Sequence, residues 1–183
     1  MSKKVIVPFA EGFEEIEALS IVDILRRAGI EVVMAGLESL HVKGAHGVTI
    51  VADALLKELD GNHFDMIALP GGLPGATNLA ADQNVQTLLK AFDAKGKAIA
   101  AICAAPYALK TAGVLKNNYT CYPGFQTKIG GEGYNAHDKV IKDANVTTSQ
   151  GPSTAMLFAL SLVEQLCSKN VADALAKDLL IVS

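Results

Sequence analysis

Short apolar runs of strand length alternate with stretches of helical periodicity along the chain. The apolar runs predict buried strands at 5–9, 30–37, 64–69 and 97–102. Apolar residues that recur every three to four positions predict helices at 14–28, 55–59, 82–95, 106–112, 154–167 and 171–179. Buried strands that alternate with helices are typical of a parallel sheet covered on both faces, so an α/β fold is predicted.

The remaining segments add small elements to this plan. Glycines punctuate a predicted hairpin over 41–51. Later strands are predicted at 119–121 and 146–149, and the Gly-rich stretch 124–133 is predicted to be a loop. Because no repeat, low-complexity tract or linker interrupts the pattern, residues 1–183 are predicted to form a single domain.

The composition is that of an ordinary globular protein, with 50% hydrophobic and 19% charged residues. A formal net charge of -3 without a basic stripe argues against direct nucleic-acid binding. Lys3 and Lys4 precede only a short apolar run, so no signal peptide is predicted. No run approaches the ~18 apolar residues of a membrane span. We therefore expect a cytoplasmic protein without a membrane partner.

The three cysteines, at 103, 121 and 167, lie far apart in the sequence. An odd number without CxxC spacing favours neither a disulfide framework nor a thiolate metal site, and no HxxxH pair suggests a metal. Cys121 lies in a predicted strand and Cys167 on an apolar predicted helix. A thiol at such positions is ordinarily a small buried hydrophobe.

Cys103 stands at a different kind of position, between the strand at 97–102 and a helix that begins almost at once. At such a strand-to-helix turn the side chain projects from the sheet edge, which is a known way to present a nucleophile. The amides of Ala104 and Ala105 open the helix and are expected to lack partners one turn back, and the positive end of the helix favours a thiolate. The alternative is a buried structural cysteine, and position alone leaves both interpretations open.

Gly71 and Gly72 follow Pro70 at the end of the strand at 64–69. The carboxyl ends of parallel strands meet at one edge of the sheet, where α/β folds place their sites. Glycines there allow the backbone to approach a ligand closely, and their amides can face a developing oxyanion. Taken alone, the two glycines are better explained by an ordinary tight turn.

Two glutamates share the apolar arc of the helix at 14–28. Glu14 stands at the helix start and can reach water, whereas Glu17 lies almost one turn further in. A carboxyl on a buried stripe is costly unless it is neutral or paired, and burial should raise its pKa. Such a group could donate a hydrogen bond to a thiolate or move a proton. Periodicity does not choose between Glu14 and Glu17, and either could simply support the helix start.

No histidine follows a predicted strand, so a local Cys–His pair is not predicted. The four histidines, at 41, 46, 63 and 137, are expected to be surface or loop residues. The segment Ser149–Pro152 ends the last predicted strand and could form part of a pocket wall.

Five segments of the chain form a recognisable set, because they occur in order, at consistent spacing and over nearly the whole length. They are Glu14–Glu17, Arg26–Ile30, Leu69–Gly72, Ala100–Pro106 and Thr148–Pro152. In this set the chain resembles the ThiJ/PfpI superfamily, and in particular its branch that contains YajL and the parkinsonism-associated deglycase.

This resemblance implies a flavodoxin-like three-layer sandwich with a mostly parallel central sheet, assembled as a homodimer. It assigns the nucleophile to Cys103 and its partner to Glu17, with oxyanion or substrate-binding amides at Gly72 and Ala104 beside Gly71. It also implies a thiol that is readily oxidised to a sulfinate. Members are described as glyoxalases that need no added cofactor, as deglycases acting on early methylglyoxal and glyoxal adducts of proteins and nucleotides, and as redox-sensing chaperones.

Three positions depart from patterns within the superfamily. Tyr122 stands where several members carry a histidine near the thiol, and a tyrosine, with an ordinary pKa of about 10, is a poor base near neutral pH. His46 stands where the branch has an arginine that belongs to the partner subunit. Protease-like members have histidine directly after the cysteine, whereas this chain has Ala104, so peptidase activity is not expected. Tyr122 and His46 are therefore auxiliary candidates.

The leading hypothesis is glyoxalase or deglycase chemistry on small α-oxoaldehydes or their adducts, with Cys103 as nucleophile. A rival hypothesis is an oxidative-stress sensor or chaperone that uses the same thiol with little catalysis. A third is a scaffold in which the cysteine is vestigial, which the missing histidine favours.

Overall fold

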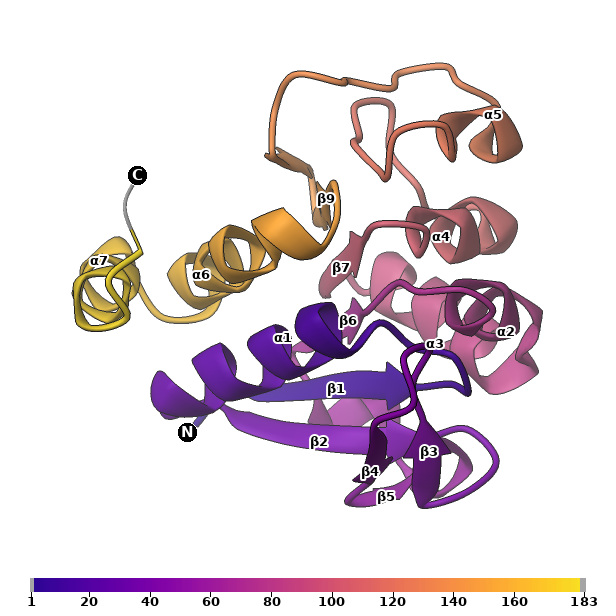
Figure 1. Cartoon of the computed structure of the whole chain (residues 1–183), viewed down its shortest axis with the longest axis horizontal. Helices are drawn as coiled ribbons and strands as arrows, with labels where there is room; N and C mark the ends of the chain where they lie inside the picture. The colour runs from indigo at the N-terminus through magenta and orange to yellow at the C-terminus, as the bar shows by residue number, and fades with distance from the viewer. Residues whose placement is uncertain (1, 182–183) are drawn as a thin grey trace.

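A seven-stranded sheet forms the middle layer of the computed structural model, which describes residues 2–181 (Figure 1). Its strand order is β5-β2-β1-β6-β7-β9-β8, and only β8 runs antiparallel to its neighbour. The strands are β1 (Lys4–Phe9), β2 (Glu31–Gly36), β5 (Ala54–Leu55), β6 (Met66–Leu69), β7 (Ala98–Ile102), β8 (Val140–Asp143) and β9 (Val146–Ser149). When β1, β2, β6, β7 and β9 are numbered 1 to 5 along the chain, their order across the sheet is 2-1-3-4-5. This is the strand order of flavodoxin-like folds.

Helices cover both faces of this sheet, as the apolar pattern predicts. One face carries α1 (Glu15–Arg27), α6 (Ala155–Leu166) and α7 (Lys169–Asp178). The other carries α2 (Gly75–Ala81), α3 (Gln83–Ala94) and α4 (Pro106–Ala112). Alternate side chains of each strand enter different cores: Val5 and Val7 pack on the first face and Ile6 on the second. The predicted three-layer sandwich is confirmed.

Helix α1 forms because its sequence supplies both a cap and an apolar stripe. The carboxylate of Glu14 accepts a hydrogen bond from the N–H of Glu17 at 2.8 Å and caps the first turn. Ala18, Ile21 and Leu25 form its fully buried side. The helix is therefore tied down at its start, which is the end that faces the carboxyl edge of the sheet.

A small separate hairpin, β3 (His41–Lys43) and β4 (Thr49–Val51), confirms the element predicted over 41–51. Its turn lies against the segment that precedes α1. The N–H of Ala45 donates to the carbonyl of Phe13 at 2.8 Å, and the N–H of Gly12 donates to the carbonyl of Lys43 at 2.8 Å. A hairpin distant in sequence thus becomes a wall beside the start of α1.

Several predicted elements differ from the structure. Residues 119–121 form no strand, only an isolated bridge between Tyr119 and Tyr134. The predicted helix at 55–59 is the short strand β5 followed by a 3-10 turn, η1 (Leu56–Glu58). The predicted loop at 124–133 contains a single helical turn, α5 (Gln126–Ile129). Further 3-10 turns occur at η2 (Gly61–His63) and η3 (Pro152–Thr154).

Two elements lack any prediction, α2 and β8. Helix α2 is short and rich in small residues, so it has no apolar period to detect. Strand β8 is an edge strand whose alternate residues face solvent, and its polar positions hide it. Among residues 2–181, no helix combines the length and apolar character that a bilayer crossing requires.

Candidate active site

The turn at Cys103 is held in a strained conformation at the carboxyl edge of the sheet. Cys103 has a φ of 64°, in the left-handed region that residues with a side chain rarely adopt. Its N–H donates to the carbonyl of Ser149 at 3.0 Å, and its carbonyl accepts from the N–H of Tyr122 at 2.9 Å. The predicted projecting turn is confirmed, and these two bonds hold the strain in place.

Two backbone amides, those of Gly72 and Ala104, are directed at the sulfur of Cys103. They come from different strand ends, because Gly72 follows β6 and Ala104 follows β7. The amide of Ala105 instead donates to the carbonyl of Ile102 at 3.0 Å, so the prediction that it stays unpartnered is wrong. The thiol thus faces one amide from its own turn and one from the neighbouring strand.

Glu17 lies beside this thiol and is fully buried. Its Oε2 accepts a hydrogen bond from the N–H of Gly71 at 2.8 Å, and its carboxyl group is within hydrogen-bonding reach of Cys103. Its Oε1 is buried without a hydrogen-bond partner among residues 2–181. A neutral carboxyl that donates its O–H to the sulfur would satisfy this group.

Glu17 and Cys103 compete for one negative charge. Burial raises the pKa of Glu17 to about 7, against the hydrogen bonds with Gly71 and Cys103 that lower it. Burial also raises the pKa of Cys103, and an ionised Glu17 raises it further, while the amides of Gly72 and Ala104 lower it. Two adjacent buried charges repel strongly, so ionisation of either group disfavours ionisation of the other. The thiolate predicted from the helix end alone therefore forms only while Glu17 stays protonated.

Glu14, the other candidate carboxyl, has a different position. Its side chain caps α1 and lines the pocket above the thiol. Periodicity does not choose between the two glutamates, but the structure separates them: Glu14 caps the helix, and Glu17 lies beside the sulfur of Cys103. Of the two, only Glu17 has the burial and the neighbour that proton transfer to Cys103 requires.

Gly72 is a position where no side chain fits. Its φ is 90°, and a Cβ there would lie 2.4 Å from the N atom of Glu14 and 2.6 Å from the carbonyl of Gly12. Both neighbours are backbone atoms at the start of α1 and cannot move aside cheaply. As a result, the end of β6 packs against the start of α1, and the amide of Gly72 is directed at the thiol of Cys103.

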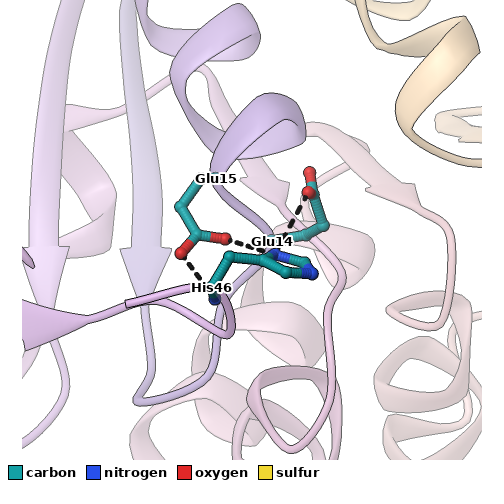
Figure 2. Close-up of side chains that lie close together, drawn as sticks. All are labelled: Glu14, Glu15 and His46. Atoms are coloured by element: carbon teal, nitrogen blue, oxygen red, sulfur yellow. Dashed lines mark hydrogen bonds and ion pairs between the residues drawn. The ribbon is translucent and has the colours of Figure 1, made fainter. Parts of the chain in front are cut away.

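Glu15 fastens the hairpin turn to the start of α1 (Figure 2). Its Oε1 accepts from the N–H of His46 at 2.7 Å and from the N–H of Val48 at 3.3 Å, and its Oε2 lies 2.9 Å from Nδ1 of the His46 ring. Gly44 leaves room for this carboxylate, because a Cβ there would lie 2.4 Å from Oε1. One buried carboxylate thus holds the whole turn.

Glu14, Glu15 and His46 also form a group of possible metal ligands, with atoms within 4.8 Å of one another. Burial raises the pKa of Glu15, but the hydrogen bonds from His46 outweigh it and leave that pKa lowered. The hydrogen bond to Glu15 in turn raises the pKa of His46. The hydrogen bonds between Glu15 and His46 explain why the three side chains lie close together. We call Glu14, Glu15 and His46 the clamp.

Replacing Glu15 with alanine should lower the free energy of unfolding by about 2 kcal/mol, because two partly buried backbone amides lose their acceptor. Glu15→Gln keeps a carbonyl oxygen for both amides and should lose only about 1 kcal/mol. Urea unfolding at pH 7 measures both values. Equal stability of Glu15→Ala and the unaltered protein would contradict the clamp.

A pocket of about 350 Å³ opens above the thiol. Its lining residues are Glu14, Ala45, His46, Gly72, Leu73, Cys103, Ala104, Tyr122 and Phe125. His46 is a largely exposed turn residue, as predicted, but the hairpin brings it to the pocket mouth. Tyr122 is half-exposed at the same mouth. Of the candidate site residues, Cys103, Gly72, Ala104, Tyr122 and His46 lie on the pocket surface. Gly71 and Glu17 lie behind it, against Cys103.

The other two cysteines lie outside this arrangement. Cys121 is buried, and burial raises its pKa to about 12. It occupies an irregular segment, so its prediction as a strand residue is wrong, although its predicted burial is confirmed. Cys167 is exposed just after α6, where a buried apolar helix position was expected.

Three contributors to the site escape sequence reasoning: Glu15, Leu73 and Phe125. Glu15 stands in a quoted motif, but its partners lie about 31 residues further along the chain. Leu73 and Phe125 belong to irregular segments after β6 and before α5, where no period reports a side chain's direction.

Known proteins resemble this chain in both sequence and fold. The model of the DJ-1/PfpI family matches residues 3–165. The crystal structure of Drosophila melanogaster DJ-1beta superposes with a TM-score of 0.96 at 39% identity, covering 100% of each chain.

Curated relatives show the same similarity in sequence. "Protein DJ-1 homolog B" of Arabidopsis thaliana is 41% identical over 93% of this chain, but the chain spans only 40% of that protein. "Glutathione-independent glyoxalase DJR-1.2" of Caenorhabditis elegans is 39% identical over 92% of this chain and 91% of its own length.

Proposed function

The chain belongs to the DJ-1/PfpI family, and from that membership we propose that it is a cysteine-dependent glyoxalase or deglycase. Its substrates would be methylglyoxal, glyoxal or their early adducts on proteins and nucleotides, without an added cofactor. The name of the nematode relative, a glutathione-independent glyoxalase, supports this class of chemistry. The observation that carries the proposal is the fully buried Glu17 carboxyl group beside the Cys103 thiol, which supports a nucleophile paired with an acid–base group.

The proposed reaction begins when the Cys103 thiolate attacks the aldehyde carbon. The S–C bond forms, the carbonyl π electrons move to oxygen, and Glu17 supplies the proton to give a hemithioacetal. The amides of Gly72 and Ala104 are placed to stabilise the developing oxyanion. The Glu17 carboxylate then removes the proton from the former aldehyde carbon and returns it to the neighbouring carbon. The hydroxyl proton of the former aldehyde carbon passes to the oxygen of the neighbouring carbon, which gives a thioester. Water hydrolyses this thioester to the hydroxy acid and the free thiol.

The test is lactate formation from methylglyoxal by the pure protein. Cys103→Ser should lose at least a thousandfold in kcat/KM, because the hydroxyl is a far weaker nucleophile in this setting. Cys121→Ser and Cys167→Ser are matched controls that change a thiol outside the pocket. Equal turnover by Cys103→Ser and the unaltered protein would exclude the mechanism.

The convergence of donors on the sulfur also favours a second candidate, an oxidative-stress sensor or chaperone. The amides of Gly72 and Ala104 and a neutral Glu17 could hold the oxygens of a sulfinate at Cys103. Mass spectrometry after mild peroxide treatment distinguishes the two functions. Selective addition of two oxygens at Cys103, together with negligible methylglyoxal turnover, would favour the sensor.

We also propose that the chain forms a homodimer in the cytoplasm. Ile16 and Leu19, one helical turn apart on α1, are 57% and 40% exposed, and Met156 on the adjacent α6 is 50% exposed. Large apolar side chains gathered on packed helices are typical of interfaces. Ile16→Asp should shift sedimentation equilibrium from dimer to monomer, and a monomeric unaltered protein would exclude this assembly.

The proposed location in the cytoplasm is supported by the three free thiols, which fit a reducing compartment.

A further inference from the structure

One side of the Cys103 pocket is apolar and open to solvent. Leu73 is 52% exposed and Tyr122 is 51% exposed, and both lie at the same pocket. Both line the pocket together with Phe125, while Glu14 and His46 line the polar side. The thiol therefore lies between a charged wall and an apolar wall.

The apolar wall is held in place before any ligand arrives. The N–H of Tyr122 donates to the carbonyl of Cys103, and the N–H of Phe125 donates to the carbonyl of Tyr122, both at 2.9 Å. The Tyr122 ring lies on Gly151, where an added Cβ would be 3.2 Å from Cδ2. The Phe125 ring packs edge-on against Tyr107 at 6.2 Å between centroids. A fixed wall loses little conformational entropy when it binds a ligand.

The pocket is large for the smallest substrates of the proposed reaction. Its volume of about 350 Å³ corresponds to roughly ten waters, at about 30 Å³ each. A three-carbon aldehyde bonded to Cys103 would leave most of this space filled with water against apolar side chains. A larger apolar group on the substrate would displace that water favourably.

We propose that Leu73, Tyr122 and Phe125 form a subsite for an apolar tail, so that α-oxoaldehydes with an aryl or branched alkyl group are preferred over methylglyoxal. This inference rests on the proposed function and names its substrate class. The aldehyde carbon lies at Cys103, and the tail extends along the ring of Tyr122. Aromatic tails gain additional ring–ring contacts with Tyr122 and Phe125.

The first test compares kcat/KM for phenylglyoxal and methylglyoxal. Because the two aldehydes differ in intrinsic reactivity, the informative quantity is the change in their ratio between variants. Tyr122→Ala and Phe125→Ala should each lower the phenylglyoxal-to-methylglyoxal ratio by about fivefold to tenfold. Val171→Ala, which shortens a partly exposed apolar side chain on α7, is the control and should leave the ratio unchanged. An unchanged ratio in both pocket variants would overturn the subsite.

The second test does not depend on turnover. In a Cys167→Ser background, the rate of Cys103 alkylation by N-phenylmaleimide is compared with that by N-methylmaleimide, followed by peptide mass spectrometry. The phenyl reagent should be favoured, and Tyr122→Ala should reduce that preference severalfold. Selective alkylation without aldehyde turnover would retain the subsite and reject the proposed function. Turnover without any tail selectivity in either assay would reject the subsite alone.

Discussion

A Glu17→Gln variant is expected to lose at least a hundredfold in kcat for lactate formation and yet to be more stable than the unaltered protein above pH 7. The kinetic loss follows because glutamine cannot take up or release the proton that moves between the two substrate carbons. The gain in stability follows because glutamine keeps the hydrogen-bonding shape of Glu17 without its charge. Its carbonyl can still accept from the N–H of Gly71.

The pH range of this effect follows from the raised pKa of Glu17. Burial raises the folded-state pKa from 4.5 to about 7, so the folded protein favours the protonated carboxyl. The corresponding stability is fully present below pH 4.5 and is lost as the pH rises to about 7. The loss is about 3 kcal/mol at 1.36 kcal/mol per pKa unit. Glutamine does not titrate and escapes this loss.

Urea unfolding at pH 5 and pH 8 measures the effect directly. The free energy of unfolding of Glu17→Gln should change little between these values, whereas that of the unaltered protein should fall. Glu14→Gln is the matched control, since it removes a carboxylate from the same helix start but not the one beside the thiol. Parallel pH dependence in Glu17→Gln and the unaltered protein would show that Glu17 is not the buried titrating group.

Gly71→Ala is expected to reduce kcat/KM at least a hundredfold through a steric effect. A Cβ at position 71 would lie 2.6 Å from the Cβ of Cys103 and 2.7 Å from Oε2 of Glu17. Either the thiol or the carboxyl must therefore move, and a displacement near 1 Å can lower turnover about a hundredfold. The crowding should also destabilise the protein by about 1–3 kcal/mol.

Gly96→Ala is the control for Gly71→Ala, because it lowers stability without changing the site. Gly96 has a φ of 63° and no atoms near its missing Cβ, so alanine there strains the backbone far from the pocket. It should lower stability by about 1 kcal/mol with unchanged turnover. Full activity in Gly71→Ala would contradict the close packing of Gly71 between Cys103 and Glu17.

The layers of the fold could be predicted because they depend on local apolar patterns. Strands such as β1 are buried on both faces and read as continuous apolar runs, and α1 shows its stripe and its cap within one turn. The turn at Cys103 could be predicted for the same reason, since a strand and a helix meet there without a linker. Elements with short or polar sequences, such as β8, leave no such pattern.

The chemistry of the site depends on contacts that no local pattern contains. Glu14 and Glu17 share one arc of α1, and only the approach of Gly71 and Cys103 from two other strands distinguishes them. Glu15 acquires its role when the hairpin folds over the helix start. The sequence predicts only the helix end that favours the Cys103 thiolate. Burial and the charge of Glu17, which raise the pKa of Cys103, arise from contacts between distant segments.

The most direct test of the central claim follows the thiolate absorbance of Cys103 near 240 nm against pH, in a background without Cys121 and Cys167. We predict that the Glu17–Cys103 pair loses its first proton near the pKa of Glu17, about 7, that part of the resulting negative charge lies on the sulfur, and that the thiolate absorbance therefore begins to rise in this range. Glu17→Gln should move the transition to higher pH, because an amide is a weaker donor to sulfur than a carboxylic acid. A thiolate that appears only above the ordinary thiol range, about 8.5, in both proteins would contradict the claim that Glu17 activates Cys103.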